Sequence, residues 1–149
     1  MRQIEDVDRD KILDALDELE FFQHFSLYEK KRITGMHAHF FVYDAEELMI
    51  EEGTTDTAFL ILVTGKAVVL KAGVEQPLAR IGPGDFVGEM AFLTSMARTT
   101  TVQAESQTLA IRVDQELLAR LGAEIREKIK DRIIRKLVDR VAELTRRLS

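Results

Sequence analysis

Residues 84–102 read Gly-Asp-Phe-Val-Gly-Glu-Met-Ala-Phe-Leu-Thr-Ser-Met-Ala-Arg-Thr-Thr-Thr-Val. A glycine turn leads to the carboxylate of Glu89 and to an apolar helix start, and Arg98 follows nine residues after that carboxylate. The first turn of a helix leaves backbone N–H groups without intrahelical partners, so these groups can bind an anion. Arg98 can add a bidentate phosphate contact, and an ionised Glu89 can accept a hydrogen bond from a sugar hydroxyl. The segment therefore predicts a nucleotide-binding site.

Within this segment, Phe-x-Gly-Glu-Met-Ala at residues 86–91 and Arg-Thr-x-Thr-Val at residues 98–102 resemble the phosphate-binding cassette of cyclic nucleotide-binding domains. That family includes the regulatory subunits of cyclic-AMP-dependent kinase, cyclic-nucleotide-gated channels and the bacterial catabolite activator. The resemblance implies a receptor for cyclic AMP or cyclic GMP that signals by repositioning its C-terminal helix and needs no cofactor. Further family motifs lie at residues 52–56, 59–62, 64–68 and 78–85, so the resemblance covers roughly residues 20–140.

The resemblance also implies roles for individual residues of the cassette. Gly88 and Ala91 would let the backbone approach the ligand closely. Glu89 would bind the ribose 2′-hydroxyl, and Arg98 would bind the cyclic phosphate. Thr99 would donate to a phosphate oxygen or meet the exocyclic amine of a guanine, so both bases stay open.

Two positions of the cassette depart from the family pattern. Thr100 stands where the family usually has alanine, and it adds a hydroxyl close to the expected phosphate. Val87 stands where a phenylalanine or another large residue is frequent. Neither change removes a phosphate or ribose contact. The predicted ligand-binding residues are Val87, Gly88, Glu89, Met90, Ala91, Arg98, Thr99 and Thr100.

The middle of the chain alternates short strand-forming runs with turns that contain glycine, which is typical of an antiparallel sandwich or barrel. The predicted fold class is therefore mainly β with flanking helices, and the resemblance specifies an eight-stranded jelly-roll barrel, a double-stranded β-helix. We expect one domain over residues 1–149, with N-terminal helices at 1–38, the barrel at 39–113 and lid helices at 114–149. Strands are expected at residues 40–43, 48–51, 58–64, 67–71, 76–81, 98–104 and 108–113.

Helical signals flank the predicted strands. Residues 4–19 carry apolar side chains at helical spacing. Ser26 and Glu29 have the form of a capping box, which predicts a helix over residues 27–36. A further helical region opens at Asp114, where acidic groups suit the first turn, and Gly122 interrupts it before a long final helix.

The final helix carries two apolar sets. The first recurs every four residues and should face the core: Ile125, Ile129, Ile133 and Leu137. The second alternates by three and four, as in a coiled-coil seam: Ile134, Leu137, Val141, Leu144 and Leu148. The whole apolar face could pack on its own barrel, or the late part could form a homodimer, and the sequence leaves both open. The resemblance places one hydrophobic lid residue over the base, and the candidates are Ile129, Ile133, Leu137 and Val138.

The net charge of −5 is unevenly distributed along the chain. Residues 1–119 carry 11 Lys/Arg and 21 Asp/Glu, whereas residues 120–149 carry 10 and 5. Because the acidic body would repel nucleic acid, we expect no direct DNA binding. The chain has no cysteine, no apolar secretion signal and no apolar run long enough for a bilayer. These features predict a cytoplasmic protein that contacts no membrane.

A metal enzyme and a transcription factor are weaker alternatives. His37-Ala38-His39 has the His-x-His form of cupin metal ligands, but the next glutamate is Glu46 and no histidine follows, so we expect no metal site. A factor of the catabolite-activator type would append a helix-turn-helix domain, whereas this chain ends at Ser149. The sequence shows no nucleophile–base pair and no kinase signature, so we expect no catalysis.

A ligand-free jelly-roll module for interaction or dimerisation is the remaining alternative. In that case Arg98 and Glu89 would form a structural salt bridge that closes an empty loop. In the receptor interpretation, the chain carries no output domain of its own. Its signal would then pass to an unknown downstream protein, or the chain would only buffer its ligand.

Overall fold

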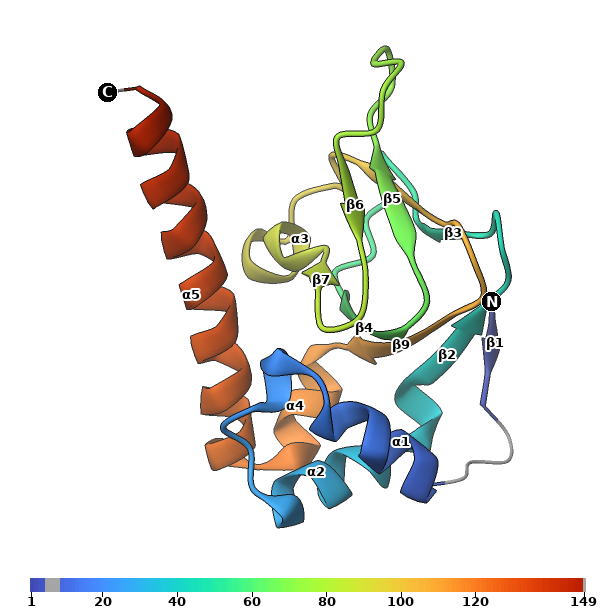
Figure 1. The fold of residues 1–149 in the computed structure, drawn as a ribbon, viewed down its shortest axis with the longest axis vertical. Helices are drawn as coiled ribbons and strands as arrows, with labels where there is room; N and C mark the ends of the chain where they lie inside the picture. Colours follow the sequence, from blue (N-terminus) through green and yellow to red (C-terminus); the bar gives the residue numbers. More distant parts are fainter. Residues whose placement is uncertain (5–8, 149) are drawn as a thin grey trace.

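Two antiparallel β-sheets pack against each other, with helices from both ends of the chain at their side (Figure 1), in a computed structural model that describes residues 1–4 and 9–148. The first sheet has the strand order β1-β2-β9-β4-β7, and the second has the order β3-β8-β5-β6. This arrangement confirms the predicted fold class, mainly β with flanking helices. The strands are β1 (Arg2–Gln3), β2 (Phe40–Tyr43), β3 (Leu48–Ile50), β4 (Phe59–Thr64), β5 (Ala67–Leu70), β6 (Ala79–Ile81), β7 (Phe86–Val87), β8 (Thr101–Ala104) and β9 (Thr108–Val113).

Most strands were predicted from strand-forming runs between turns that contain glycine, although several are shorter than expected. Residues 40–43 and 108–113 form β2 and β9 with the predicted bounds, and these two strands pair with each other. The strand predicted at residues 76–81 begins at Ala79, after Pro77, which cannot donate to a ladder. Strands β1 and β7 were missed because two residues are too few to stand out as a strand-forming run.

The strand predicted at residues 98–104 begins only at Thr101. The backbone of Arg98 pairs instead with the loop that follows β3. Its N–H donates to the carbonyl of Thr54, and its carbonyl accepts from the N–H of Gly53, both at 2.8 Å. The three residues before Thr101 therefore lie in a loop within the cassette.

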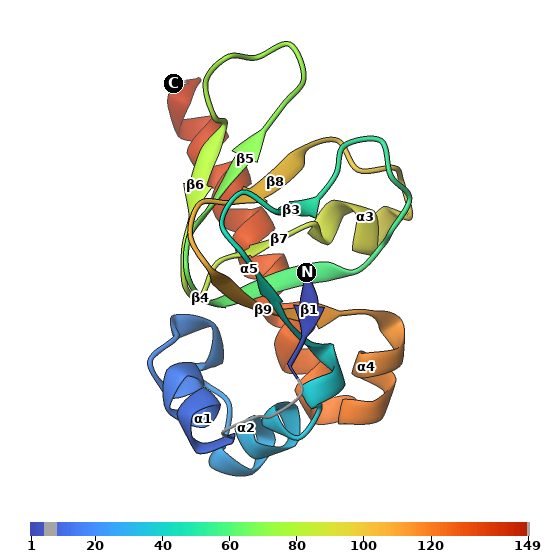
Figure 2. The ribbon, with the colours of Figure 1, turned by 90° about the vertical axis from the view of Figure 1, so that its right-hand side faces the viewer.

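The N-terminal helices lie beside the first sheet, below the sandwich in Figure 2. Of the helical pattern predicted at residues 4–19, residues 5–8 lie outside the described residues, and the described helix begins at Arg9. The capping box is confirmed, since Ser26 Oγ accepts from the Glu29 N–H at 3.1 Å and the Glu29 carboxylate accepts from the Ser26 N–H at 2.8 Å. The elements of this region are α1 (Arg9–Asp17), η1 (Glu20–Phe22), α2 (Leu27–Thr34) and η2 (His37–His39).

The C-terminal helices follow the predicted boundaries closely. Asp114 caps the first of them by accepting a hydrogen bond from the Leu117 N–H at 2.8 Å. Gly122, with a φ of 92°, separates the two helices, and a φ of this sign is costly for other residues. A short helix within the cassette precedes them in the chain. The helices are α3 (Glu89–Thr94), α4 (Gln115–Leu121) and α5 (Ala123–Arg147).

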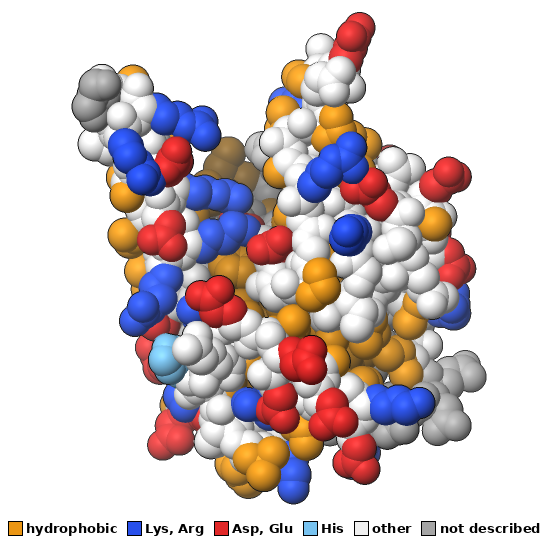
Figure 3. Space-filling view, in the orientation of Figure 1, with side chains coloured by type: hydrophobic (Ala, Val, Ile, Leu, Met, Phe, Trp, Pro, Cys, Tyr) orange, Lys and Arg blue, Asp and Glu red, His pale blue; other side chains and the backbone are white. Residues whose placement is uncertain are grey.

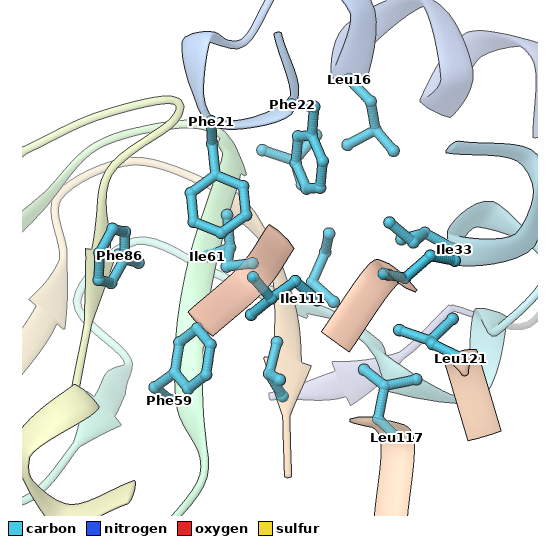
Figure 4. Packing of buried hydrophobic residues seen from close by; sticks show 14 of the residues in the cluster. Leu16, Phe21, Phe22, Ile33, Phe59, Ile61, Phe86, Ile111, Leu117 and Leu121 are labelled. Atoms are coloured by element: carbon cyan, nitrogen blue, oxygen red, sulfur yellow. The ribbon is translucent and has the colours of Figure 1, made fainter. Parts of the chain in front are cut away.

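An aromatic cluster joins the first sheet to the helices (Figure 4). The ring of Phe86 packs edge-on against Phe21 of η1 and Phe59 of β4, with centroid distances of 5.5 and 6.0 Å. The N-terminal half of α5 enters the same core, which anchors this helix to the sandwich. Its buried residues are Ile125, Ile129 and Ile133.

The apolar stripe of α5 turns away from the core along the helix. Residues four apart in an α-helix differ in direction by about 40°, so each step of the stripe rotates by that amount. Ile133 is buried, Leu137 is partly buried against the core, and Val141 is 63% exposed. Beyond Ile133, the side of α5 that faces the sandwich carries Lys136 and Arg140 instead.

Two adjacent isoleucines of α5 test this division, because Ile133 is 1% exposed and Ile134 is 57% exposed. We expect Ile133→Ala to lower the free energy of unfolding by about 2–5 kcal/mol, since it removes buried atoms and leaves a cavity. Ile134→Ala should change it by less than about 0.5 kcal/mol. Urea unfolding of dilute protein measures both variants, and equal losses would contradict the rotation of the stripe.

Candidate functional site

A cavity of about 600 Å³ lies between the sandwich, the cassette and α5. In Figure 3 it is the hollow between α5 and the sandwich, with basic side chains along the α5 side. All eight residues that the sequence predicted to bind a ligand line this cavity. They come from β7, from α3 and from the loop before β8, so the fold brings the whole predicted set together.

The guanidinium of Arg98 lies at the wall of the cavity, and this residue is 6% exposed. It donates hydrogen bonds to the carbonyl of Gly88 at 2.9 Å and to the carbonyl of Ala58, and the carboxylate of Asp56 lies 3.6 Å away. Burial lowers the pKa of the Arg98 guanidinium, and the charge of Asp56 opposes this shift. A guanidinium has five N–H donors and keeps its charge in proteins. Some N–H groups of the Arg98 guanidinium therefore remain available to bind an anion in the cavity.

The carboxylate of Glu89 is the second buried charge, and this residue is 3% exposed. Its Oε1 lies 3.2 Å from Lys136 Nζ and 3.4 Å from a guanidinium nitrogen of Arg140, both on α5. No hydrogen-bond donor to this oxygen is found among the described residues, which is unusual for a buried acceptor. The oxygen is thus compensated in charge and still able to accept a hydrogen bond.

Lys136 has a partly buried environment of its own. Its Nζ donates to the carbonyl of Phe86 and lies 4.1 Å from the centre of the Phe86 ring. Burial lowers the pKa of the Lys136 ammonium, and the charge of Glu89 opposes this shift. A cation over an aromatic face is favourable, so these contacts hold the middle of α5 against β7.

Gly88 sits between the two charged residues and caps α3 with a φ of 89°. A Cβ at this position would lie 2.7 Å from Nη1 of Arg98 and 2.9 Å from Cδ1 of Ile50. Both the backbone conformation and the available space therefore require glycine here. This close approach brings the peptide that precedes α3 to the cavity wall.

The remaining cassette residues differ in exposure. Thr99 and Met90 are exposed at the cavity rim, Thr100 is half-buried, and Val87 and Ala91 are buried. The carbonyl of Thr99 accepts a hydrogen bond from Lys71 at 2.8 Å. This bond fixes the backbone of Thr99 and leaves its side chain at the rim, where a ligand would pass.

The four lid candidates do not line the cavity. Ile129 and Ile133 are buried in the core, Leu137 packs partly against the core, and Val138 is 58% exposed. The residues of α5 that reach the cavity are Lys136 and Arg140. Sequence reasoning missed this pair, although position 136 lies two turns beyond Ile129 and therefore shares its side of the helix. Arg140 follows one turn later on that side.

Asp56 is a further residue whose role was not predicted. Its carboxylate accepts from the guanidinium of Arg112 at 2.6 Å and from the Ala58 N–H at 3.2 Å, while it also faces Arg98. The position belongs to a family motif noted in the sequence, but no spacing shows which cation it will meet. Asp56 supports the guanidinium of Arg98 from outside the cavity.

The structural salt bridge between Arg98 and Glu89 that the ligand-free alternative implies is not formed. Within residues 1–4 and 9–148, no ion pair joins Arg98 to Glu89, since each has other charge partners.

His39 is buried at the helix-to-strand junction, with its Nδ1 3.2 Å from the Arg112 carbonyl. The described residues contain no cluster of three or more metal-ligand side chains. None of the described helices combines the length and apolarity that a bilayer crossing needs.

Two glycines with nearly the same φ separate backbone strain from crowding at the site. Gly53 has a φ of 88° and open space where a Cβ would lie, whereas a Cβ at Gly88 would collide with Arg98. We expect Gly53→Ala to lower the free energy of unfolding by about 1–2 kcal/mol through the left-handed backbone alone. Gly88→Ala should cost about 1–3 kcal/mol more, because Arg98 has to move. If urea unfolding gave equal losses of unfolding free energy for the two variants, Arg98 would be able to move away from a Cβ at position 88 at little cost.

The chain is similar in sequence and in fold to known proteins. The cAMP-dependent protein kinase regulatory subunit of Aspergillus fumigatus is 31% identical over 106 residues, which is 71% of this chain and 25% of that protein. This chain therefore spans about a quarter of the length of that relative. A cyclic nucleotide-binding domain from Methylobacillus flagellatus has a similar fold, with a TM-score of 0.73, 22% identity and coverage of 93% of this chain and 81% of that one.

A second solved structure, CBD2 of PKAR with bound Sp-2Cl-cAMPS, gives a TM-score of 0.70 at 24% identity, with coverage of 94% of this chain and 90% of that one. At such identities these likenesses establish the fold. The sequence profile described as "Cyclic nucleotide-binding domain" matches residues 40–124, which include strands β2 to β9, the cassette and α4. The chain therefore belongs to the cyclic nucleotide-binding domain family.

Proposed function

We propose that the chain is a receptor domain without catalytic activity that binds cyclic AMP and admits cyclic GMP. The proposal is carried by two buried charged groups that line one cavity without pairing with each other. Arg98 and Glu89 are each more than nine-tenths buried, and each has separate charge partners. A phosphate suits the donors of a guanidinium, and a hydroxyl suits a carboxylate oxygen that lacks a donor. A cyclic nucleotide presents both groups side by side.

Each cassette residue would contact a different part of the ligand. Arg98 would bind the cyclic phosphate, Glu89 the ribose 2′-hydroxyl, and Gly88 and Ala91 would admit the ligand close to the backbone. Thr99, exposed at the rim, would meet the base. Its hydroxyl could contact the exocyclic amine of guanine, so cyclic GMP also remains a candidate ligand. The similarity to subunits named as cAMP-dependent supports adenine as the preferred base.

The output of the domain would be the position of α5. A ligand shifts this helix only by the difference between its affinities for the two positions. Of the four lid candidates, Leu137 and Val138 could approach a base after such a shift, because Ile129 and Ile133 are held in the core. The relatives are named as regulatory subunits, which supports passing the signal to a separate protein partner.

Isothermal titration with cyclic AMP and cyclic GMP tests the receptor function. The protein should first be unfolded and refolded, so that nucleotide carried through purification is removed. We expect micromolar or tighter binding of cyclic AMP, with the ratio of the two affinities reporting on Thr99. No heat and no thermal shift with either nucleotide would favour the ligand-free interaction module.

Arg98→Leu tests the phosphate site. We expect it to weaken cyclic AMP binding by about 2–5 kcal/mol, because the phosphate would lose its charged partner in a partly buried site. Arg112→Leu is the matched control, since Arg112 pairs with the same carboxylate of Asp56 but does not line the cavity. Titration should show a loss for the first variant and near-normal binding for the second. Normal binding by Arg98→Leu would refute the assignment.

The exposed part of α5 supports a homodimer as a second property of the chain. Ile134 and Val141 fall at a positions of a heptad and Leu137 and Leu144 at d positions, and β-branched a residues with leucine at d favour parallel two-stranded coiled coils. Ile134, Val141 and Leu144 are 57–63% exposed in the single chain. Because this seam is short, we propose a weak and concentration-dependent dimer.

Val141→Lys tests the dimer by placing a charge in the middle of the seam. We expect it to abolish a concentration-dependent rise in mass, because two buried ammonium groups would face each other. Ala142→Lys, one residue further and outside the heptad seam, should leave association unchanged. Sedimentation equilibrium compares the two, and a monomeric wild-type chain at all concentrations would end the dimer proposal.

A further inference from the structure

The oxygen proposed to receive the ribose hydroxyl is also the oxygen that α5 contacts. Lys136 and Arg140 both approach Oε1 of Glu89, at 3.2 and 3.4 Å, and Oε1 has no hydrogen-bond donor among the described residues. A hydroxyl bonded to a carboxylate lies at about 2.5–2.7 Å, closer than either cation. Since Lys136 and Arg140 also line the cavity, a hydroxyl at that distance would compete with them for Oε1.

The half of α5 beyond Ile133 is well placed to respond to such competition. A second cavity, of about 580 Å³, lies between η1, the turn before β7 and α5, and it shares Lys136 and Arg140 with the first. The middle of α5 is therefore bordered by open space on two sides. The apolar residues that follow it are largely exposed, and this end of the helix stands away from the sandwich in Figure 1.

Arg98 makes its polar contacts with the sandwich and its loops. Its guanidinium donates to the carbonyls of Gly88 and Ala58 and pairs with the carboxylate of Asp56. A phosphate bound by Arg98 would therefore contact the sandwich side of the cavity. Glu89 differs, because it joins the cassette to α5 directly.

We infer that Lys136 and Arg140 hold α5 in its unliganded position through Glu89, and that the ribose 2′-hydroxyl is the ligand group that releases it. This inference rests on the proposed function. The phosphate supplies affinity, and the hydroxyl displaces the two cations from Oε1. Both cations can be hydrated after release, since the Arg140 side chain is 57% exposed and Lys136 borders two cavities. A cyclic nucleotide without the 2′-hydroxyl binds and leaves α5 in place.

The experiment compares cyclic AMP with 2′-deoxy-cyclic AMP and reads binding and helix position separately. Because the chain has no cysteine, spin labels can be attached to Thr64→Cys at the end of β4 and Ala142→Cys on α5, both exposed. Labelled protein is diluted with unlabelled protein to suppress distances between copies. Titration establishes saturation for each ligand, and pulsed electron resonance measures the distance between labels.

We expect 2′-deoxy-cyclic AMP to bind roughly tenfold to a hundredfold more weakly than cyclic AMP, through loss of one charge-assisted hydrogen bond. At saturation, cyclic AMP should produce a new label distance, and the deoxy ligand should keep the unliganded one. Equal shifts with both ligands would overturn the inference and leave the receptor function intact. Binding of neither ligand would overturn the receptor function itself.

Glu89→Gln provides the second arm, because it keeps the shape and an acceptor oxygen while removing the negative charge. Without ligand, its label distance should match that of wild type saturated with cyclic AMP. Asp131→Asn is the control, since Asp131 pairs with Arg135 on the exposed side of α5 at 3.0 Å and should leave the distance unchanged. An unliganded Glu89→Gln with the wild-type distance would show that this ion pair does not hold the helix.

Discussion

The buried guanidinium of Arg98 is the constraint on which the open end of the sandwich depends. Removing a charge from water costs several kcal/mol unless hydrogen bonds and an opposite charge compensate it. Here the compensation comes from two backbone carbonyls and from Asp56, while the Arg98 backbone pairs with the loop after β3. Two loops far apart in the sequence are thereby fixed around one side chain. The cavity keeps its shape because these groups are satisfied within the protein, with donors left over for an anion.

The second organising feature is the rotation of the apolar stripe along α5. Near its start the stripe faces the core and anchors the helix through Ile129 and Ile133. Two turns later the side that faces the sandwich carries Lys136 and Arg140, and the apolar residues point outward. One helix therefore provides an anchor, a cationic wall of the cavity and an exposed seam in succession. A strict seven-residue repeat would have drifted by only about 20° per heptad, against about 40° for each four-residue step of this stripe.

Much of the fold and of the cassette could be predicted because the relevant signals are local. Strand-forming runs between turns placed β2 and β9, the capping box placed the start of α2, and the segment from Glu89 to Arg98 forms part of the cavity wall. Helical spacing places Lys136 and Arg140 on the side of Ile129, but it does not show that this side of α5 meets the cavity. Which side of that helix meets the cavity depends on the backbone at Gly122 and on the packing of Ile133, neither of which is readable from spacing alone. The prediction considered only apolar lid residues and therefore missed Lys136 and Arg140.

The same geometry limits which ligand contacts can carry a signal. A contact that is equally strong in both positions of α5 adds affinity and shifts no population. Arg98, whose hydrogen bonds and ion pair lie in the sandwich and its loops, belongs to this class whatever anion it binds. Glu89 belongs to the other class, because its carboxylate is shared between the cavity and α5. In the proposed mechanism, affinity and signalling could therefore be altered separately, since the groups that would govern them lie on opposite sides of Gly88.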